Sequence, residues 1–349
     1  MDVLMMPILF LIAGLLARPS FARKGARPFM AGKVKRLLFP FLLLTVLFSP
    51  IMPFIRQYLR AAGSGIEPAG FWPFWLSFMT NGTKIYASPV MASKDLIVNQ
   101  YWFLMLLFIF FAGYTLYNSM RGRNGGIDAA HPPEKPISKS ALLGKIAIFC
   151  LIIEAAWIVA CLFIEGTLWM TLGGLWQVQP AKVPIYLGLF LAGVYIERRN
   201  LLPAIVGITR PVVWFAAALV SIAAYLLIVL KTLGVPDVSI FLILAVRMLR
   251  IIMLITVSLW LFTLFQNRFN RATAVWKELS ANSYNIYLIH MVVVVVFQLL
   301  VMALPVPSFL KFGIVSLLTL AVCYLAGRFI VNRSSKAAMV VVIPVSYTH

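Results

Sequence analysis

Apolar residues fill long uninterrupted stretches of this chain, and polar residues gather in the shorter stretches between them. Nine apolar segments stand out, at residues 3–16, 37–55, 102–117, 141–164, 184–196, 211–230, 239–265, 283–303 and 309–331. Most of them reach the ~20 residues that a helix needs to cross ~30 Å of hydrocarbon. The first and the fifth are short. The pattern predicts an all-α bundle of about nine transmembrane helices, forming one integral membrane domain over residues 1–339.

The composition supports the same class. Of 349 residues, 62% are apolar and only 11% are charged. A soluble domain of this size cannot bury that much apolar surface, so the chain is expected to be a polytopic membrane protein.

The formal net charge is +20, which raises the question of a nucleic-acid partner. The positions of the charges argue against it. Alternate stretches, at 17–36, 118–145, 197–210, 266–282 and 328–349, hold 21 of the 30 Lys and Arg residues, and the stretches between them hold seven. The positive-inside rule then predicts an external N-terminus and a cytoplasmic C-terminus in the cell inner membrane. Anionic inner-leaflet lipid is the expected bulk partner.

Few polar side chains fall inside the apolar segments. Glu154 lies in the fourth, Arg247 and Arg250 lie one helical turn apart in the seventh, and His290 lies in the eighth. Ionisable groups at membrane depth are costly and usually need partners, so these four are predicted to converge on a polar cavity. Three alternatives stay open: His290 bonded to a neighbouring helix for packing, Glu154 as a structural partner of Tyr or Trp, and a protruding seventh segment whose arginines reach headgroups.

A basic stretch precedes the second segment. Lys33, Lys35 and Arg36 lie where a helix is expected to enter from the inner face. A helix N-terminus with added cations forms a phosphate site, and a plain positive-inside anchor is the alternative. The aromatic stretch at residues 71–75 is expected either to lie at the headgroups or to line a substrate cleft.

Signatures of metal and cofactor chemistry are absent from the sequence. No Walker loop, GxGxxG, HExxH, DxD or Ser/His/Asp pattern occurs, and His131 and His349 fall in a loop and the tail. The three cysteines lie in apolar segments without a C-x-x-C pair, as expected of packing residues. We expect no metal and no permanently bound cofactor.

Four stretches together resemble the membrane acyltransferase-3 family. Residues 5–14, MMPILFLIAG, are similar to its second helix, and residues 35–40, KRLLFP, to the end of its basic loop. Residues 101–104, YWFL, are similar to a helix start of that family, and residues 279–290, LSANSYNIYLIH, to its late helix. The order and spacing are closest to the branch that succinylates or acetylates periplasmic glucans.

The resemblance implies a ten-helix enzyme that moves an acyl group from cytoplasmic acyl-CoA to a glycan hydroxyl outside the membrane. Lys33, Lys35 and Arg36 would then bind CoA phosphates. His290 and Tyr287 would border the path of the acyl group. The expected substrate-binding residues are Glu154, Arg247, Arg250 and Trp102.

The sequence departs from the family at its start, because the first helix, with an arginine and the histidine taken as the base, has no counterpart. We therefore expect an N-terminally truncated, inactive or impaired chain, and His290 is not promoted to that base. Residues 340–349 resemble translated adapter sequence and are expected to be a non-native or disordered tail.

Two rival functions remain. Intramembrane Glu, Arg and His are also typical of a secondary transporter, although the sequence shows no repeat between its halves. A non-catalytic membrane scaffold is the third possibility.

Overall fold

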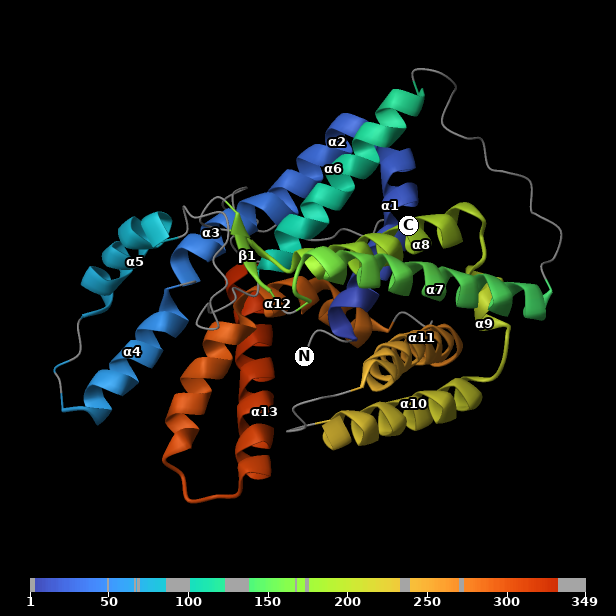
Figure 1. The fold of residues 1–349 in the computed structure, drawn as a ribbon. Helices are drawn as coiled ribbons and strands as arrows, with labels where there is room; N and C mark the ends of the chain where they lie inside the picture. Colours follow the sequence, from blue (N-terminus) through green and yellow to red (C-terminus); the bar gives the residue numbers. More distant parts are fainter. Residues whose placement is uncertain are drawn as a thin grey trace. The chain divides into compact units, whose positions relative to one another are not determined.

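The computed structural model describes residues 4–48, 50–65, 67, 70–85, 101–122, 138–166, 168–172, 176–232, 239–269 and 273–331. Within these ranges, eight helices are long and apolar enough to cross a membrane (Figure 1). The described strands are β1 (Met170–Leu172) and β2 (Trp176–Val178), an antiparallel pair that places Thr171 opposite Gln177. The predicted all-α polytopic membrane class is confirmed.

The helices follow the predicted apolar segments closely. In chain order they are α1 (Met5–Lys24), α2 (Ala26–Lys33), the π-helical η1 (Val34–Leu38), α3 (Phe39–Phe48), α4 (Ile51–Gly63), α5 (Phe71–Ile85), α6 (Trp102–Gly122), α7 (Lys139–Phe163), the 3₁₀ turn η2 (Pro180–Lys182), α8 (Val183–Arg198), α9 (Leu202–Val206), α10 (Pro211–Thr232), α11 (Ile240–Arg268), α12 (Ala274–Met302), α13 (Ser308–Ala326) and the π-helical η3 (Gly327–Val331).

Each of the nine predicted segments overlaps a helix. The fifth is short as expected, because α8 has 16 residues and is not among the eight candidate spans. The first is longer than expected. Helix α1 continues beyond the apolar run to Lys24 and reaches 20 residues.

Three of the long helices begin at a hydroxyl side chain that accepts a hydrogen bond from the first turn. Ser138 accepts from the amide of Ala141 at the start of α7, and Thr273 accepts from that of Trp276 at the start of α12. Ser239 does the same for α11. Such caps satisfy amides that have no partner inside the helix.

The chain forms two compact units, and each one combines segments that are distant in sequence. The first consists of Met1–Ala31, Ile109–Trp169 and Gln179–Arg271. The second consists of Gly32–Phe108, Met170–Val178 and Ala272–His349.

In the first unit, α1 and α8 pack with their backbones in close approach. A Cβ atom added to Gly14 would lie 2.0 Å from the carbonyl oxygen of Phe190, and one added to Gly193 would lie 2.2 Å from that of Leu11. Only glycine fits at both positions. Small residues at helix interfaces are a common way of bringing membrane helices together.

The rest of the first unit packs around aromatic rings and hydroxyl pairs. The ring centroid of Phe10 lies 4.9 Å from that of Tyr186 and 5.3 Å from that of Phe110. Helices α10 and α11 run side by side (Figure 1), and the hydroxyls of Ser221 and Thr256 lie 3.0 Å apart between them. A hydrogen bond between two helices fixes their register in an environment without water.

In the second unit, α12 and α13 run side by side, and η3 continues α13 along the start of α12 (Figure 1). The start of α6 joins them, since the hydroxyl of the fully buried Tyr101 donates to the carbonyl of Leu288 at 2.7 Å. The middle of α12 is thereby held against residues before and after it in the chain.

Candidate functional site

The first unit brings together three of the predicted intramembrane residues. Glu154 on α7 is 1% exposed, and both of its oxygens lack a hydrogen-bond partner among the described residues. Arg247 and Arg250 on α11 lie close enough to interact with this carboxylate electrostatically. Two cations beside one buried carboxylate offset part of its desolvation cost. These three groups therefore lie near one another in the first unit, and their role at a polar cavity stays a prediction.

Both guanidinium groups lie over the ring of Trp157, one helical turn beyond Glu154. Their carbon atoms are 4.7 Å and 5.0 Å from the ring centroid, for Arg247 and Arg250 respectively. A cation over an indole face gains ~0.5–2 kcal/mol, with the larger values where water is excluded. The arginines are thus directed toward α7 within their unit. Trp157 was not among the predicted site residues, although its i, i+3 spacing from Glu154 places both on one helical face.

These residues lie well inside their helices. Glu154 is ~14 Å from the end of α7 at Phe163, and Arg247 is ~10 Å from the start of α11 at Ile240. The stacking on Trp157 therefore favours the interior reading of the arginine pair over the headgroup reading.

A cavity of about 110 Å³ lies beside this cluster in the first unit, and its character is apolar. Ile153 and Leu254 contribute to its wall, whereas Glu154, Arg247 and Arg250 do not line it. This cavity is therefore not the polar cavity expected from the sequence.

In the second unit, the basic stretch does not lie at a helix N-terminus. Helix α2 begins at Ala26 and runs into η1 and α3 without a break, and Lys33 has helical φ and ψ of −73° and −39°. The prediction that free amide groups of a helix start lie beside the three cations is wrong, because a helix already precedes these residues. Lys33 and Arg36 are half-buried and Lys35 is exposed.

The turn that carries Lys35 and Arg36 is π-helical, with the amide of Phe39 bonded to the carbonyl of Val34. Proline has no amide hydrogen, so Pro40 cannot donate to the carbonyl four residues before it, that of Arg36. The hydroxyl of Tyr284 on α12 donates to this carbonyl. The basic stretch and the late helix, which the sequence analysis treated as separate motifs, are therefore joined in one unit.

Next to this contact, the middle of α12 carries His290 and Tyr287. The ring of Tyr287 lies 6.1 Å from that of Phe103, the neighbour of Trp102 at the start of α6. Trp102 itself is 4% exposed. The motifs at residues 101–104 and 279–290 thus lie side by side in the second unit.

The half-buried ring of His290 is held against its own helix. Its Nδ1 atom lies 2.7 Å from the carbonyl oxygen of Tyr287. A carbonyl only accepts hydrogen bonds, so in this contact Nδ1 is the donor. Because His290 and Glu154 belong to different units, their convergence on one cavity stays a prediction.

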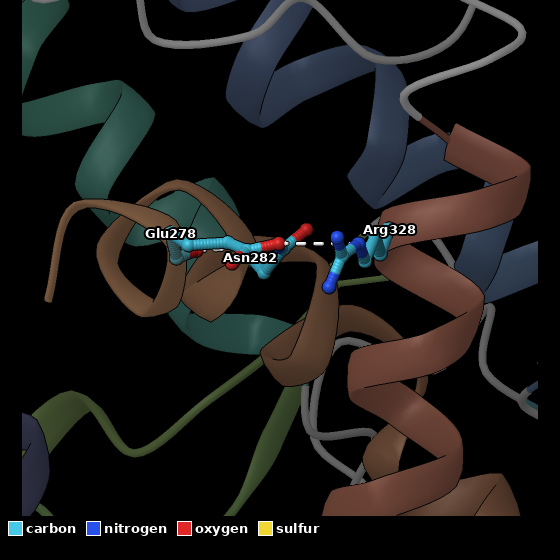
Figure 2. A network of polar contacts seen from close by, with 3 residues as sticks. All are labelled: Glu278, Asn282 and Arg328. Carbon is cyan, nitrogen blue, oxygen red and sulfur yellow. Dashed lines mark hydrogen bonds and ion pairs between the residues drawn. The ribbon is translucent and has the colours of Figure 1, made fainter. Parts of the chain in front are cut away.

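A polar contact that the sequence analysis missed holds the start of α12 to η3. Figure 2 shows this contact between Glu278, Asn282 and Arg328. The Nε of Arg328 lies 3.2 Å from a carboxylate oxygen of Glu278. The side-chain amide of Asn282 donates to the carbonyl of Glu278 at 3.0 Å. Only ten acidic residues occur in the chain, so the scarcity of carboxylates was a signal pointing to Glu278.

The aromatic stretch at residues 71–75 forms the first turn and a half of α5. Trp72 is 72% exposed, whereas the indole of Trp75 donates to the carbonyl of Val46 on α3 at 3.2 Å. Its predicted headgroup and cleft roles both stay open.

No cluster of three or more potential metal ligands occurs in the part of the chain that the structure describes. His131, His349 and the predicted tail at 340–349 lie outside the described residues.

The fold and these sites define a class, that of polytopic membrane proteins with buried polar side chains on several helices. The sequence matches the family model described as acyltransferase domain over residues 2–328. The chain belongs to this acyltransferase-3 family, and the protein is a membrane acyltransferase. No curated protein and no solved structure matches it significantly.

Proposed function

We propose that this acyltransferase moves an acetyl or succinyl group from cytoplasmic acyl-CoA to a hydroxyl of an extracytoplasmic glycan. The protein crosses a bacterial inner membrane several times, with its C-terminus in the cytoplasm. The acceptor class follows the periplasmic-glucan branch that the motifs resemble. Lys33, Lys35 and Arg36 bind the phosphates of the acyl-CoA donor.

One observation carries this proposal. The basic turn and the helix of His290 and Tyr287 contact each other within one unit, through the hydrogen bond from Tyr284 to the Arg36 carbonyl. On α12, Tyr284 and His290 are ~9 Å apart along the helix axis. A donor whose phosphates lie at Arg36 therefore has the His290 region within the length of its own flexible arm.

The chemistry needs little from the protein besides placement and charge. The oxygen of a glycan hydroxyl attacks the thioester carbonyl, a C–O bond forms, the C–S bond breaks, and the CoA thiol takes a proton. A neutral histidine that accepts the hydroxyl proton contributes ~10²–10⁴-fold. Cations or amide donors stabilise the oxyanion. The base that the resemblance implies is not assigned to a described residue, and His290 borders the path.

The first prediction concerns the donor site. Lys35→Ala and Arg36→Ala are made in protein that is expressed from its intact gene and reconstituted in liposomes. Each loses a charge-assisted contact to phosphate, so the KM for acyl-CoA should rise about tenfold or more. The matched control is Lys145→Ala, an exposed cation on α7. Transfer of labelled acyl groups to glycan is measured. No transfer by the wild-type protein would contradict the proposed function.

A transporter is the second candidate, and the cluster of Glu154, Arg247 and Arg250 favours it, because ionisable groups at membrane depth are typical of transport pathways. Flux of the acceptor glycan across liposomes without any acyl-CoA would support that alternative. Flux that requires acyl-CoA turnover would exclude it.

A further inference from the structure

The carbonyl of Arg36 accepts a hydrogen bond from another helix, four residues before a proline. A helix normally satisfies this carbonyl with the amide four residues later, and Pro40 has none. Such a carbonyl takes a partner from outside the α-helical pattern. Tyr284 supplies that partner with its hydroxyl.

Helix α12 is built to hold Tyr284 in this position. Successive residues turn by about 100° around a helix, so Tyr284 points away from the face that carries Glu278 and Asn282. That face is fixed by the ion pair to Arg328 and by close packing, since a Cβ added to Gly327 would lie 3.0 Å from the side-chain oxygen of Asn282.

The opposite face of α12 is fixed as well. The carbonyl of Leu288, one turn beyond Tyr284, accepts from Tyr101, and the ring of Tyr287 packs against Phe103. With both faces held, the hydroxyl of Tyr284 has a defined position relative to the basic turn within its unit.

We infer that Tyr284 is a positioning residue for the acyl-CoA donor: its hydroxyl, by holding the Arg36 carbonyl, fixes the turn that directs Lys35 and Arg36 at the donor phosphates. The inference rests on the proposed donor site. It assigns no contact with the donor to Tyr284 itself. Its effect therefore belongs in donor binding and not in the chemical step.

The second prediction is made for Tyr284→Phe, which keeps the ring and removes the hydroxyl. Losing the hydrogen bond frees the basic turn, so the KM for acyl-CoA should rise about tenfold while kcat stays within about twofold of the wild type. The control is Tyr324→Phe on α13, a half-buried tyrosine of the same unit. It should leave both constants unchanged.

Suppression provides the sharper test. Pro40→Ala returns the amide four residues after Arg36, so the π-helical turn can revert to α-helical bonding, in which that amide donates to the Arg36 carbonyl and the hydroxyl of Tyr284 becomes dispensable. In the Pro40→Ala background, Tyr284→Phe should change the KM by less than about twofold. The amide at position 40 and the hydroxyl of Tyr284 serve the same carbonyl, so the effects of the two substitutions should not add. Failure of this suppression, with Tyr284→Phe equally harmful in both backgrounds, would overturn the inference.

The outcomes separate this inference from the function on which it rests. A normal KM in Tyr284→Phe, together with a raised KM in Lys35→Ala, would reject the role of Tyr284 and leave the donor site standing. A fall in kcat without a change in KM would also reject it, because a donor-positioning contact acts on binding. Absence of acyl transfer in the wild type would reject the proposed function first.

Discussion

At the scale of single residues, this protein carries ionisable groups whose placement is expensive. The carboxylate of Glu154 is buried without a hydrogen bond from a described residue, and it tolerates that position because two guanidiniums are close by. The indole of Trp157 in turn holds both arginines over its ring. The residues that mark this cluster were recognisable from their scarcity in apolar segments, whereas Trp157 was one aromatic among many.

The third prediction concerns this cluster. Glu154→Gln leaves two cations without their counter-charge, and Arg250→Gln leaves the carboxylate with less compensation, so each should lower the stability of the detergent-solubilised protein. In the double variant the losses should be smaller than their sum by ~0.5–3 kcal/mol, because the residues are coupled. Thermal unfolding gives the values. Arg268→Gln, at the exposed end of α11, is the control, and strict additivity would contradict the coupling.

At the scale of helices, two glycines decide how α1 and α8 meet. Gly14 and Gly193 face each other's helix so closely that a methyl group on either would overlap a backbone carbonyl. Gly14 lies in a stretch that was interpreted only as an apolar segment and as a family motif. Its packing role depends on a partner 179 positions later, which no local pattern reveals.

The fourth prediction follows from this contact. Gly193→Ala should lower the Tm of the solubilised protein, because overpacking a tight interface costs ~1–3 kcal/mol. Gly144→Ala on α7 is the matched control, since an added Cβ there meets nothing within 4 Å. In an exposed helix interior, that control should stabilise slightly. Equal Tm values for both variants would rule out the close approach.

At the scale of the whole molecule, the membrane orientation remains a prediction from charge, and local contacts agree with it. The charge pattern assigns the stretches around Arg36, Glu278 and Arg328 to the inner face. Within the second unit, Arg36 contacts the start of α12 and Arg328 pairs with Glu278. Stretches assigned to one side of the membrane thus meet each other.

The fifth prediction tests that orientation. After replacement of the three native cysteines, single cysteines are introduced at Ser64 and Ser280, both exposed and both in the second unit. An impermeant maleimide applied to intact spheroplasts should label Ser64→Cys, because its loop carries few cations and is predicted to be outside. Ser280→Cys should react only after permeabilisation. The reverse pattern would invert the proposed topology and place the basic turn outside.

The sequence by itself determined the class of this protein and the approximate limits of its helices. Apolar runs long enough to span a bilayer can form only helices there, because every backbone group must find its partner inside the segment. Motif resemblance added the family, and the scarcity of charged residues in apolar segments pointed to Glu154, Arg247, Arg250 and His290.

Only the tertiary structure decided which of those groups meet. Whether Arg250 reaches Trp157, or Tyr284 reaches the carbonyl of Arg36, depends on how distant helices pack. The continuous helix through Lys33 shows the same limit. A basic stretch before an apolar run predicted a helix start, but the chain is already helical from Ala26, so the cations lie within a continuous helix.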